Sequence, residues 1–156
     1  MLPLKYLKDL ILKYKPKTPK INTNMKQNKY FNESEFKCKH CGKIPEGMPP
    51  DSLIDFLCEI REHYNSPVII NSGYRCKEHN AKIGGAPKSR HVEGDAVDFV
   101  VKGVKTLDLY NYIIETYGSK PWGIAKRISK DPYAGFVHVD HRGSKARWTY
   151  KGSIVP

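Results

Sequence analysis

The stretch Ser89-Arg90-His91-Val92-Glu93-Gly94-Asp95-Ala96-Val97-Asp98-Phe99-Val100-Val101 decides the fold of this chain. Its second half is an apolar, β-branched run that predicts a buried strand. Gly94 stands just ahead of that strand and allows the chain to turn sharply. Within the strand, Val97 and Phe99 point to one face of the sheet and Asp98 to the other. Because a buried, unpaired carboxylate is costly, Asp98 needs a metal ion, an arginine or a hydrogen-bond partner.

A second apolar run, Phe-Val-His-Val-Asp at residues 136–140, predicts another strand with His138 and Asp140 on one face. Taken singly, a histidine in such a strand is more often a hydrogen-bonded core residue than a ligand. An aspartate is more often paired with a basic side chain. Two imidazoles and one carboxylate, however, form the ligand set of catalytic zinc sites that keep a fourth position for water. We therefore predict that His91, Asp98 and His138 bind one Zn²⁺ ion.

The remaining pattern predicts an α+β fold, with a small, mostly antiparallel sheet and flanking helices. Helices are expected where apolar residues recur at helical spacing, and strands where β-branched residues cluster. The predicted helices cover residues 51–64, 77–83 and 106–117, and the predicted strands cover residues 67–71, 96–101, 122–125, 136–140 and 147–150. Asp51 and Thr106 are expected to be the N-caps of the two longer helices. Residues 30–36 are expected to form a turn that places aromatic side chains against the core.

Length and charge suggest how the chain is organised. A chain of 156 residues suggests one domain, which we place at residues 30–156. Residues 1–29 form a predicted basic arm, with an amphipathic helix over residues 4–14 and a linker after it. The net charge of +11 creates a positive field that concentrates polyanions. The charge is also compatible with a merely lysine-rich surface.

Some partners and locations are not expected. No nucleic-acid-binding motif accompanies the basic charge, so specific nucleic-acid binding is not predicted. No apolar run is long enough to predict a transmembrane helix. Lysines and Asp9 interrupt the apolar residues at the front of the chain, which therefore does not resemble a Sec signal peptide.

The cysteines leave several interpretations open. Cys38 and Cys41 have the Cys-x-x-Cys spacing of a structural zinc site. A complete site needs two more ligands, and the sequence has no second Cys-x-x-Cys pair; His40, Cys58 or Cys76 could contribute. A structural metal, a disulfide and simple burial of small side chains all remain possible, with reduced thiols favoured in the absence of a signal peptide.

The motif Ser-x-His-x-x-Gly-x-Ala-x-Asp at residues 89–98, followed by His-x-Asp in a strand, resembles the M15 family of zinc peptidases. That family includes D-alanyl-D-alanine carboxypeptidases, dipeptidases and phage endolysins that cut the stem peptides of peptidoglycan. The segment Ile-Asn-Ser-Gly-Tyr-Arg at residues 70–75 resembles a further segment of the family. The resemblance implies a fold like that of Hedgehog and DD-peptidases, one catalytic zinc ion and zinc-dependent hydrolysis of stem peptides.

The same resemblance implies roles for individual residues. His91, Asp98 and His138 correspond to the zinc ligands. Arg75 corresponds to an arginine that steadies the substrate carboxylate or the oxyanion, although a structural ion pair is the simpler alternative for it. Ser89 corresponds to a serine that orders the loop around the first ligand. A guanidinium suits the proposed role because it can hold a carboxylate with two hydrogen bonds.

The general base does not follow from the resemblance. Many relatives place an acid three residues before the last histidine ligand, and that position is Gly135 in this chain. Asp140 is our candidate for the base or for a group that supports His138, and a structural bond to Arg142 is an equal alternative. Glu93 and His141 are weaker candidates for the base.

Two other functional classes stay open at this point. Relatives such as the Hedgehog signalling domain keep the zinc ion and act as binding modules, and a metal-free polyanion-binding domain is the third possibility. If the chain is a peptidase, the resemblance implies action on the cell wall after synthesis in the cytoplasm, as for a phage-released lysin. The basic arm would then favour anionic cell-wall polymers.

Overall fold

The computed structural model describes residues 28–154 of the chain. The helix predicted over residues 4–14 lies outside these residues, and the division into an arm and a domain stays a prediction. The elements, in chain order, are a 3-10 turn η2 (Glu33–Phe36), α2 (Asp51–Tyr64), β1 (Val68–Ser72), α3 (Lys77–Lys82), α4 (Arg90–Glu93), β2 (Ala96–Val101), α5 (Thr106–Tyr117), β3 (Gly123–Arg127), β4 (Phe136–Asp140) and β5 (Ala146–Thr149).

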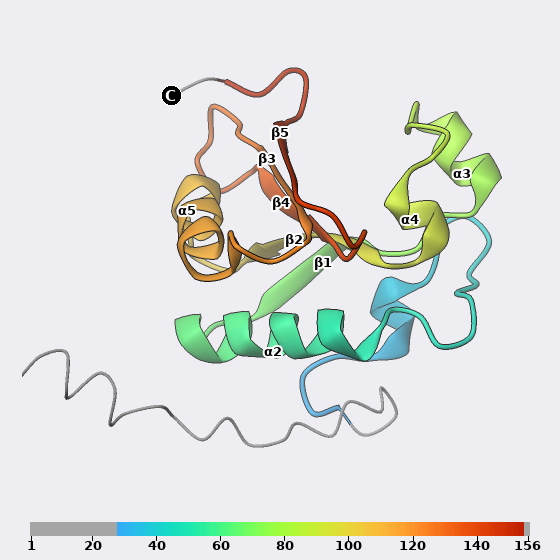
Figure 1. Ribbon diagram of the computed structural model, residues 1–156, viewed down its shortest axis with the longest axis horizontal. Coiled ribbons are helices and arrows are strands. Elements are labelled where there is room, and N and C mark those ends of the chain that lie inside the picture. The colour runs from blue at the N-terminus through green and yellow to red at the C-terminus, as the bar shows by residue number, and fades with distance from the viewer. Residues whose placement is uncertain (1–27, 155–156) are drawn as a thin grey trace, which may run out of the picture.

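The strands form one five-stranded sheet in the order β1-β2-β4-β3-β5 (Figure 1). The pairs β1/β2, β2/β4 and β4/β3 are antiparallel, and only the last pair, β3/β5, is parallel. This arrangement confirms the predicted α+β fold with a mostly antiparallel sheet. The described helices include none with both the length and the apolar character that crossing a bilayer requires.

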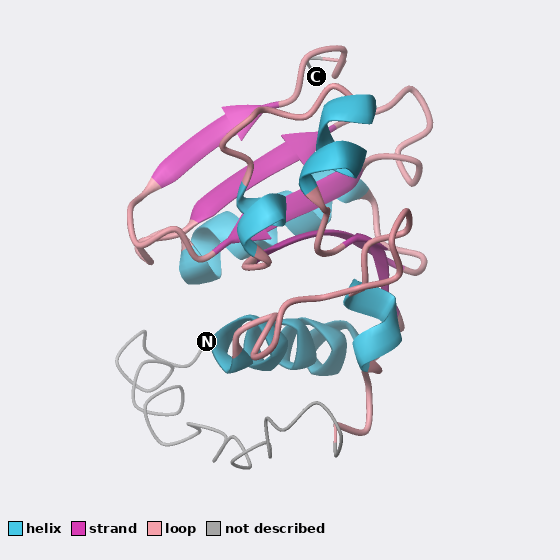
Figure 2. Cartoon of the chain, turned by 90° about the vertical axis from the view of Figure 1, so that its right-hand side faces the viewer, coloured by secondary structure: helices cyan, strands magenta, loops and turns pink. Residues whose placement is uncertain are grey.

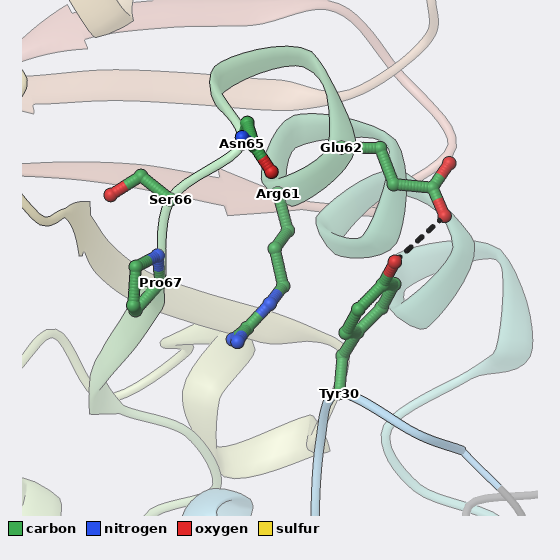
Figure 3. Close-up of a pocket in the computed structure, with 6 residues that line it drawn as sticks. All are labelled: Tyr30, Arg61, Glu62, Asn65, Ser66 and Pro67. Atoms are coloured by element: carbon green, nitrogen blue, oxygen red, sulfur yellow. Dashed lines mark hydrogen bonds between the residues drawn. The ribbon is translucent and has the colours of Figure 1, made fainter.

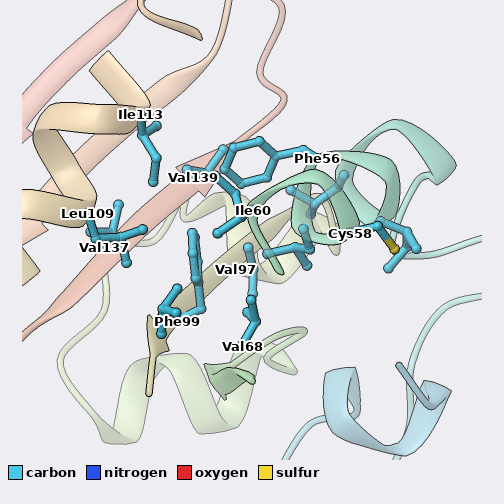
Figure 4. Close-up of a cluster of buried hydrophobic side chains, with 14 of the residues drawn as sticks. Phe56, Cys58, Ile60, Val68, Val97, Phe99, Leu109, Ile113, Val137 and Val139 are labelled. Carbon is cyan, nitrogen blue, oxygen red and sulfur yellow. The ribbon is translucent and has the colours of Figure 1, made fainter. Parts of the chain in front are cut away.

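One face of the sheet carries the hydrophobic core. Val97 and Phe99 of β2 and Val137 and Val139 of β4 are fully buried there against apolar side chains of α2 and α5 (Figure 4). The helical spacing of α2 produces its buried stripe, which comprises Leu53, Ile54, Phe56, Leu57 and Ile60. Each such side chain contributes about 1.5–3 kcal/mol when it is fully buried. The turn η2 closes one end of this layer, because Phe31 and Phe36 are buried beside it.

The opposite face of the same strands is polar. Asp98 of β2 is the register partner of His138 in β4, and Gly123 of β3 is the partner of Asp140. Directly opposed residues of antiparallel strands have neighbouring side chains on one face. A Cβ atom on Gly123 would collide with the Asp140 carboxylate, so glycine is required at that position.

The short helix α4 brings His91 to this polar face. It ends at Gly94, whose positive φ of 92° is readily adopted only by glycine. The chain then enters β2, and the turn predicted at Gly94 is therefore present. Figure 2 shows the sheet with its helices from the side.

The predicted N-caps are wrong by one residue. Pro50 and Lys105 occupy the cap positions, and neither helix has a side-chain cap hydrogen bond. Asp51 is the first residue of α2, where its charge suits the positive end of the helix dipole. Thr106 is the first residue of α5; it is buried, and its backbone N–H donates to the carbonyl of Pro132 at 2.9 Å. A tertiary contact has thus replaced the local cap.

Candidate metal centre

Three side chains converge on the polar face of the sheet. His91 Nε2 lies 3.2 Å from His138 Nδ1 and 3.2 Å from Asp98 Oδ1. His138 Nδ1 lies 2.8 Å from the same Asp98 oxygen. The three atoms therefore form a small triangle, although they come from α4, β2 and β4. The structure brings together the three residues that the sequence singled out as ligands.

The outer nitrogen of each imidazole has a partner that determines where its proton sits. His91 Nδ1 lies 2.7 Å from the carbonyl oxygen of Gly73, which can only accept a hydrogen bond. His138 Nε2 lies 2.8 Å from Asp140 Oδ2, which accepts as a carboxylate. With those protons on the outer nitrogens, His91 Nε2 and His138 Nδ1 both present lone pairs to the Asp98 carboxylate. Three lone pairs at this separation repel one another unless a cation lies among them.

The centre is shielded from water. The exposed fractions of His91, His138 and Asp98 are only 1%, 3% and 8%. Burial alone would raise the pKa of Asp98, but in the absence of metal the imidazoles of His91 and His138, when protonated, outweigh burial and hold that pKa well below its usual range. Asp98 is therefore an anion, as a metal ligand must be.

Asp140 supports the centre from behind His138. Its carboxylate is fully buried and also accepts hydrogen bonds from Arg142 Nε at 2.7 Å and Arg142 Nη2 at 2.6 Å. Burial opposes the charge, but Arg142 and His138 lower the pKa of Asp140 well below its usual range. Arg142, Asp140 and His138 thus form a continuous hydrogen-bonded chain that orients the His138 ring.

A cleft of about 370 Å³ opens beside His138. Its walls are strongly basic and partly aromatic: they comprise Arg75, Gly84, Gly85, Ala86, Lys88, Ser89, Arg90, His138, Arg142, Trp148 and Tyr150. The structure therefore places Arg75 and Ser89 at the same cleft as His138. Among these lining residues there is no carboxylate.

The arginines of the cleft differ in what they bind. Arg90 pairs with Asp95, and Arg142 pairs with Asp140. Arg75 has no salt bridge among the described residues, and its buried Nε has no hydrogen-bond partner there. Burial lowers the pKa of Arg75 from its ordinary value. Among the three arginines of the cleft, Arg75 is therefore the one whose guanidinium is free to bind an anion.

The residues weighed as a general base do not reach the cleft. A Cβ atom on Gly135 would collide with the carbonyl oxygen of Arg127, so no acidic side chain fits at that position. Glu93 is exposed at the end of α4 and does not line the cleft. His141 stacks on Trp122, with ring centroids 4.2 Å apart, and its Nδ1 lies 2.8 Å from Ser52 Oγ.

Tyr150 also lines the cleft, although the sequence pattern did not single it out. The sequence indicates only that Tyr150, two residues after Trp148, lies on the same face of an extended chain as Trp148. Burial and the nearby charge of Asp98 raise the pKa of Tyr150, so its hydroxyl stays protonated and can donate a hydrogen bond. Trp148 also lines the cleft, whereas Tyr74, Trp122 and Tyr133 do not.

A second hollow lies at the end of α2, where Tyr30 bonds Glu62 (Figure 3). It is lined by Tyr30, Arg61, Glu62, Asn65, Ser66 and Pro67. Among these six described residues there is no histidine or cysteine, and the guanidinium of Arg61 lies 4.9 Å from the centre of the Tyr30 ring. This hollow offers no metal-ligand set comparable with that of the histidine centre.

A family model described as Peptidase M15 matches residues 29–140. The matched range includes Arg75, Ser89, His91, Asp98 and His138, and it ends at Asp140. No curated protein matches the sequence significantly.

Proposed function

The chain belongs to the peptidase M15 family, and from this premise we propose that it is a zinc-dependent peptidase that hydrolyses the stem peptides of peptidoglycan. Membership of the family makes the chain a metallopeptidase, which acts on peptide substrates. The observation that carries the proposal is the convergence of His91 Nε2, His138 Nδ1 and Asp98 Oδ1 at mutual distances of 2.8–3.2 Å.

These residues fit zinc by chemistry and by geometry. Zinc binds imidazole and carboxylate ligands at about 2.0–2.2 Å, and two such ligands of a tetrahedral ion are about 3.4 Å apart. The observed triangle is close to this size. Three protein ligands leave a fourth position, which is the arrangement of catalytic rather than structural zinc sites. When bound, zinc supplies a water molecule with a pKa of about 7 and polarises the carbonyl of the scissile bond.

Arg75 is the residue that we expect to bind substrate. Its unpaired guanidinium shares the cleft with His138 and can hold a carboxylate or stabilise a developing oxyanion. Tyr150 lines the same cleft and can donate a second hydrogen bond. Stem peptides carry several free carboxylates, so the basic wall suits them.

Asp140 acts on His138 rather than on substrate in this proposal. Its oxygens are fully buried and already bonded to His138 and Arg142, and it does not line the cleft. A carboxylate behind a ligand histidine fixes the ring and its tautomer, and it raises the basicity of the ligand nitrogen. Of the roles considered for Asp140, support of His138 is the one that its contacts favour.

Fragments released from purified peptidoglycan test this function. We expect the protein to release peptide fragments that mass spectrometry identifies, a chelator to stop the release, and added Zn²⁺ to restore it. The masses also distinguish removal of a terminal D-alanine from cleavage within the stem.

Two histidine variants supply the control. His91→Ala should abolish release, and His63→Ala, which changes an exposed histidine of α2, should not. Undiminished activity of His91→Ala would refute the proposed centre.

A zinc-containing binding module is the second candidate, because residues 28–154 supply no free carboxylate to the lining of the cleft and Gly135 cannot be replaced by an acid. Family membership favours the enzyme. The two candidates differ in turnover: a module would retain zinc and bind stem peptides without cleaving them. A wall substrate would also place the site of action outside the cytoplasm, which is the location we propose.

A further inference from the structure

We propose that Cys38, Cys41, Cys76 and His79 bind a second zinc ion, which has a structural role. We refer to these four residues as the cysteine cluster. Its residues belong to the loop after η2 and to the start of α3, and none of them lines the cleft beside His138. The inference is independent of the proposed peptidase activity, because it concerns a different set of side chains.

The sulfur atoms are placed as ligands of one ion. The Sγ atoms of Cys38, Cys41 and Cys76 all lie within 4.8 Å of one another. Cys38 Sγ and Cys76 Sγ are 3.7 Å apart. Zinc binds thiolates at about 2.3 Å, so two thiolates on one tetrahedral ion are about 3.8 Å apart. The observed separation therefore agrees with joint binding of one zinc ion.

His79 provides the fourth ligand. Its Nδ1 lies 3.3 Å from Cys38 Sγ. Cys76 is the N-cap of α3, and its sulfur accepts the backbone N–H of His79 at 3.4 Å, which holds the Cys-x-x-His pair together. The site then has four protein ligands, three cysteines and one histidine, as structural zinc sites do. They come in two pairs, Cys38-x-x-Cys41 and Cys76-x-x-His79.

His40 is the competing histidine. Its Nδ1 lies 3.7 Å from Cys76 Sγ, but its Nε2 faces Glu78 Oε1 at 3.7 Å. The His40 side chain is also more exposed than that of His79. The shorter contact of His79 to the buried Cys38 sulfur decides the assignment.

The backbone around Cys38 is already arranged for an anionic sulfur. The backbone N–H of Cys76 donates to Cys38 Sγ at 3.4 Å. The loop is tight, because Cys38 N–H donates to the carbonyl of Lys43 at 2.9 Å and Gly42 N–H donates to the carbonyl of Cys38 at 2.8 Å. The hydrogen bond from the Cys76 N–H to Cys38 Sγ stabilises the thiolate, which is the form that binds metal.

The location of the cluster indicates what the ion would stabilise. Cys76 directly follows Arg75, whose backbone N–H donates to the carbonyl of His91 at 2.9 Å. Two residues further back, the Gly73 carbonyl orients His91 at 2.7 Å. Zinc at the cysteine cluster would therefore tie the loop after η2 to the segment that carries Arg75 and orients His91.

Metal content of the purified protein tests the inference. We expect the wild-type chain to contain about two zinc ions per molecule, as measured by elemental mass spectrometry. Cys41→Ser and Cys76→Ser should each lose one zinc, His91→Ala should lose the other, and Cys58→Ala, which removes the cysteine outside the cluster, should keep both. One zinc in the wild type that persists in Cys76→Ser would overturn the proposal, as would a disulfide between Cys38 and Cys76 found by thiol counting.

Cobalt provides a test that needs no destabilised variant. We expect wild-type protein loaded with Co²⁺ to show thiolate-to-cobalt charge-transfer absorption in the near ultraviolet, since thiolates are soft ligands. If the cobalt-loaded protein lacked this absorption, the proposal that the cysteine cluster binds metal would be contradicted. His79→Ala should weaken the absorption and His40→Ala should leave it, and the reverse result would overturn the assignment of His79.

Discussion

The two faces of strands β2 and β4 differ completely, although they alternate residue by residue. Val97, Phe99 and Val139 face the core and are fully buried among apolar side chains. Asp98 and His138 face the other way and meet at 2.8 Å. Side chains of a strand alternate between its two faces. One register between β2 and β4 therefore determines both which apolar residues meet in the core and which polar residues meet on the other face.

The apolar face of the two strands stabilises the fold, and the polar face carries the groups that bind metal. The apolar face contributes burial, whereas the polar face contributes groups that are held in position. Catalytic groups must be held to within a fraction of an ångström, and they are held best on rigid elements. The packed core beneath β2 and β4 therefore serves the centre by fixing the strands, and mutations on the two faces should have different consequences.

The largest expected effect comes from Asp98→Asn on the polar face. Removing a ligand charge should release the metal and lower peptidase activity by at least about a thousandfold, because a bound metal supplies several kcal/mol of transition-state stabilisation. Assays on purified stem peptides measure the loss. The substitution should change the free energy of unfolding of the metal-free protein less than a substitution in the core does. Near-normal activity with a full metal content would contradict the assignment of Asp98 as a metal ligand.

Phe99→Ala changes the neighbouring residue on the apolar face. We expect the free energy of unfolding to fall by about 3–5 kcal/mol, because a fully buried aromatic side chain leaves a cavity. Denaturant titration measures the change, and zinc content per folded molecule should be retained. Ile69→Ala, at an exposed position of β1, should change stability by less than about 0.5 kcal/mol. If both variants lost the same free energy of unfolding, burial on the apolar face could not be the source of stability that we assign to it.

Arg75→Met tests the arginine of the cleft that has no salt bridge among the described residues. Loss of an oxyanion-stabilising donor typically lowers kcat by about 100–1000-fold, and we expect a loss of this order with zinc content unchanged. Lys88→Met is the matched control, since Lys88 lines the same cleft but is exposed. If the two variants lost activity equally, Arg75 would act only through the general positive charge.

Asp140→Asn tests the support of His138. The substitution keeps the shape of the side chain but removes the charge that His138 and Arg142 share. We expect zinc affinity to fall about 10–100-fold, as is typical when the partner of a ligand histidine is changed. Competition with a chelator measures this affinity. A pure loss of kcat with unchanged zinc affinity would instead favour Asp140 as the general base.

Ser89→Ala should have the smallest effect. Ser89 is the N-cap residue of α4, but its side chain makes no cap hydrogen bond. Its backbone bonds to Ala86 and Val92, at 2.9 Å each, survive the substitution. We expect a change of less than about 0.5 kcal/mol in stability and little change in kcat/KM. A large increase in KM alone would show that the hydroxyl contacts substrate.

The sequence predicted the polar face well because periodicity is a local property. The strand at residues 136–140 has the predicted bounds, and alternation alone placed His138 and Asp140 on one face. The family resemblance is confirmed by the matching family model. Alternation alone does not predict that Asp98 pairs with His138. That pairing depends on the register between two strands that lie far apart in the sequence, and the structure supplies the register.

Other features could not be predicted from local patterns. Cys76 and His79 reach Cys38 only because α3 folds back against the loop after η2. Tyr150 reaches the cleft because β5 joins the sheet edge in parallel to β3, which no periodicity signals. The N-cap predicted at Thr106 is wrong, because a backbone contact from Thr106 to Pro132 determines how α5 begins and Lys105 occupies the cap position.

Anomalous X-ray scattering at the zinc edge, from crystals of the zinc-loaded protein, tests the central claim most directly. We predict a zinc peak about 2.0–2.2 Å from His91 Nε2, His138 Nδ1 and a carboxylate oxygen of Asp98. Zinc-soaked crystals with no peak among these three side chains would contradict it.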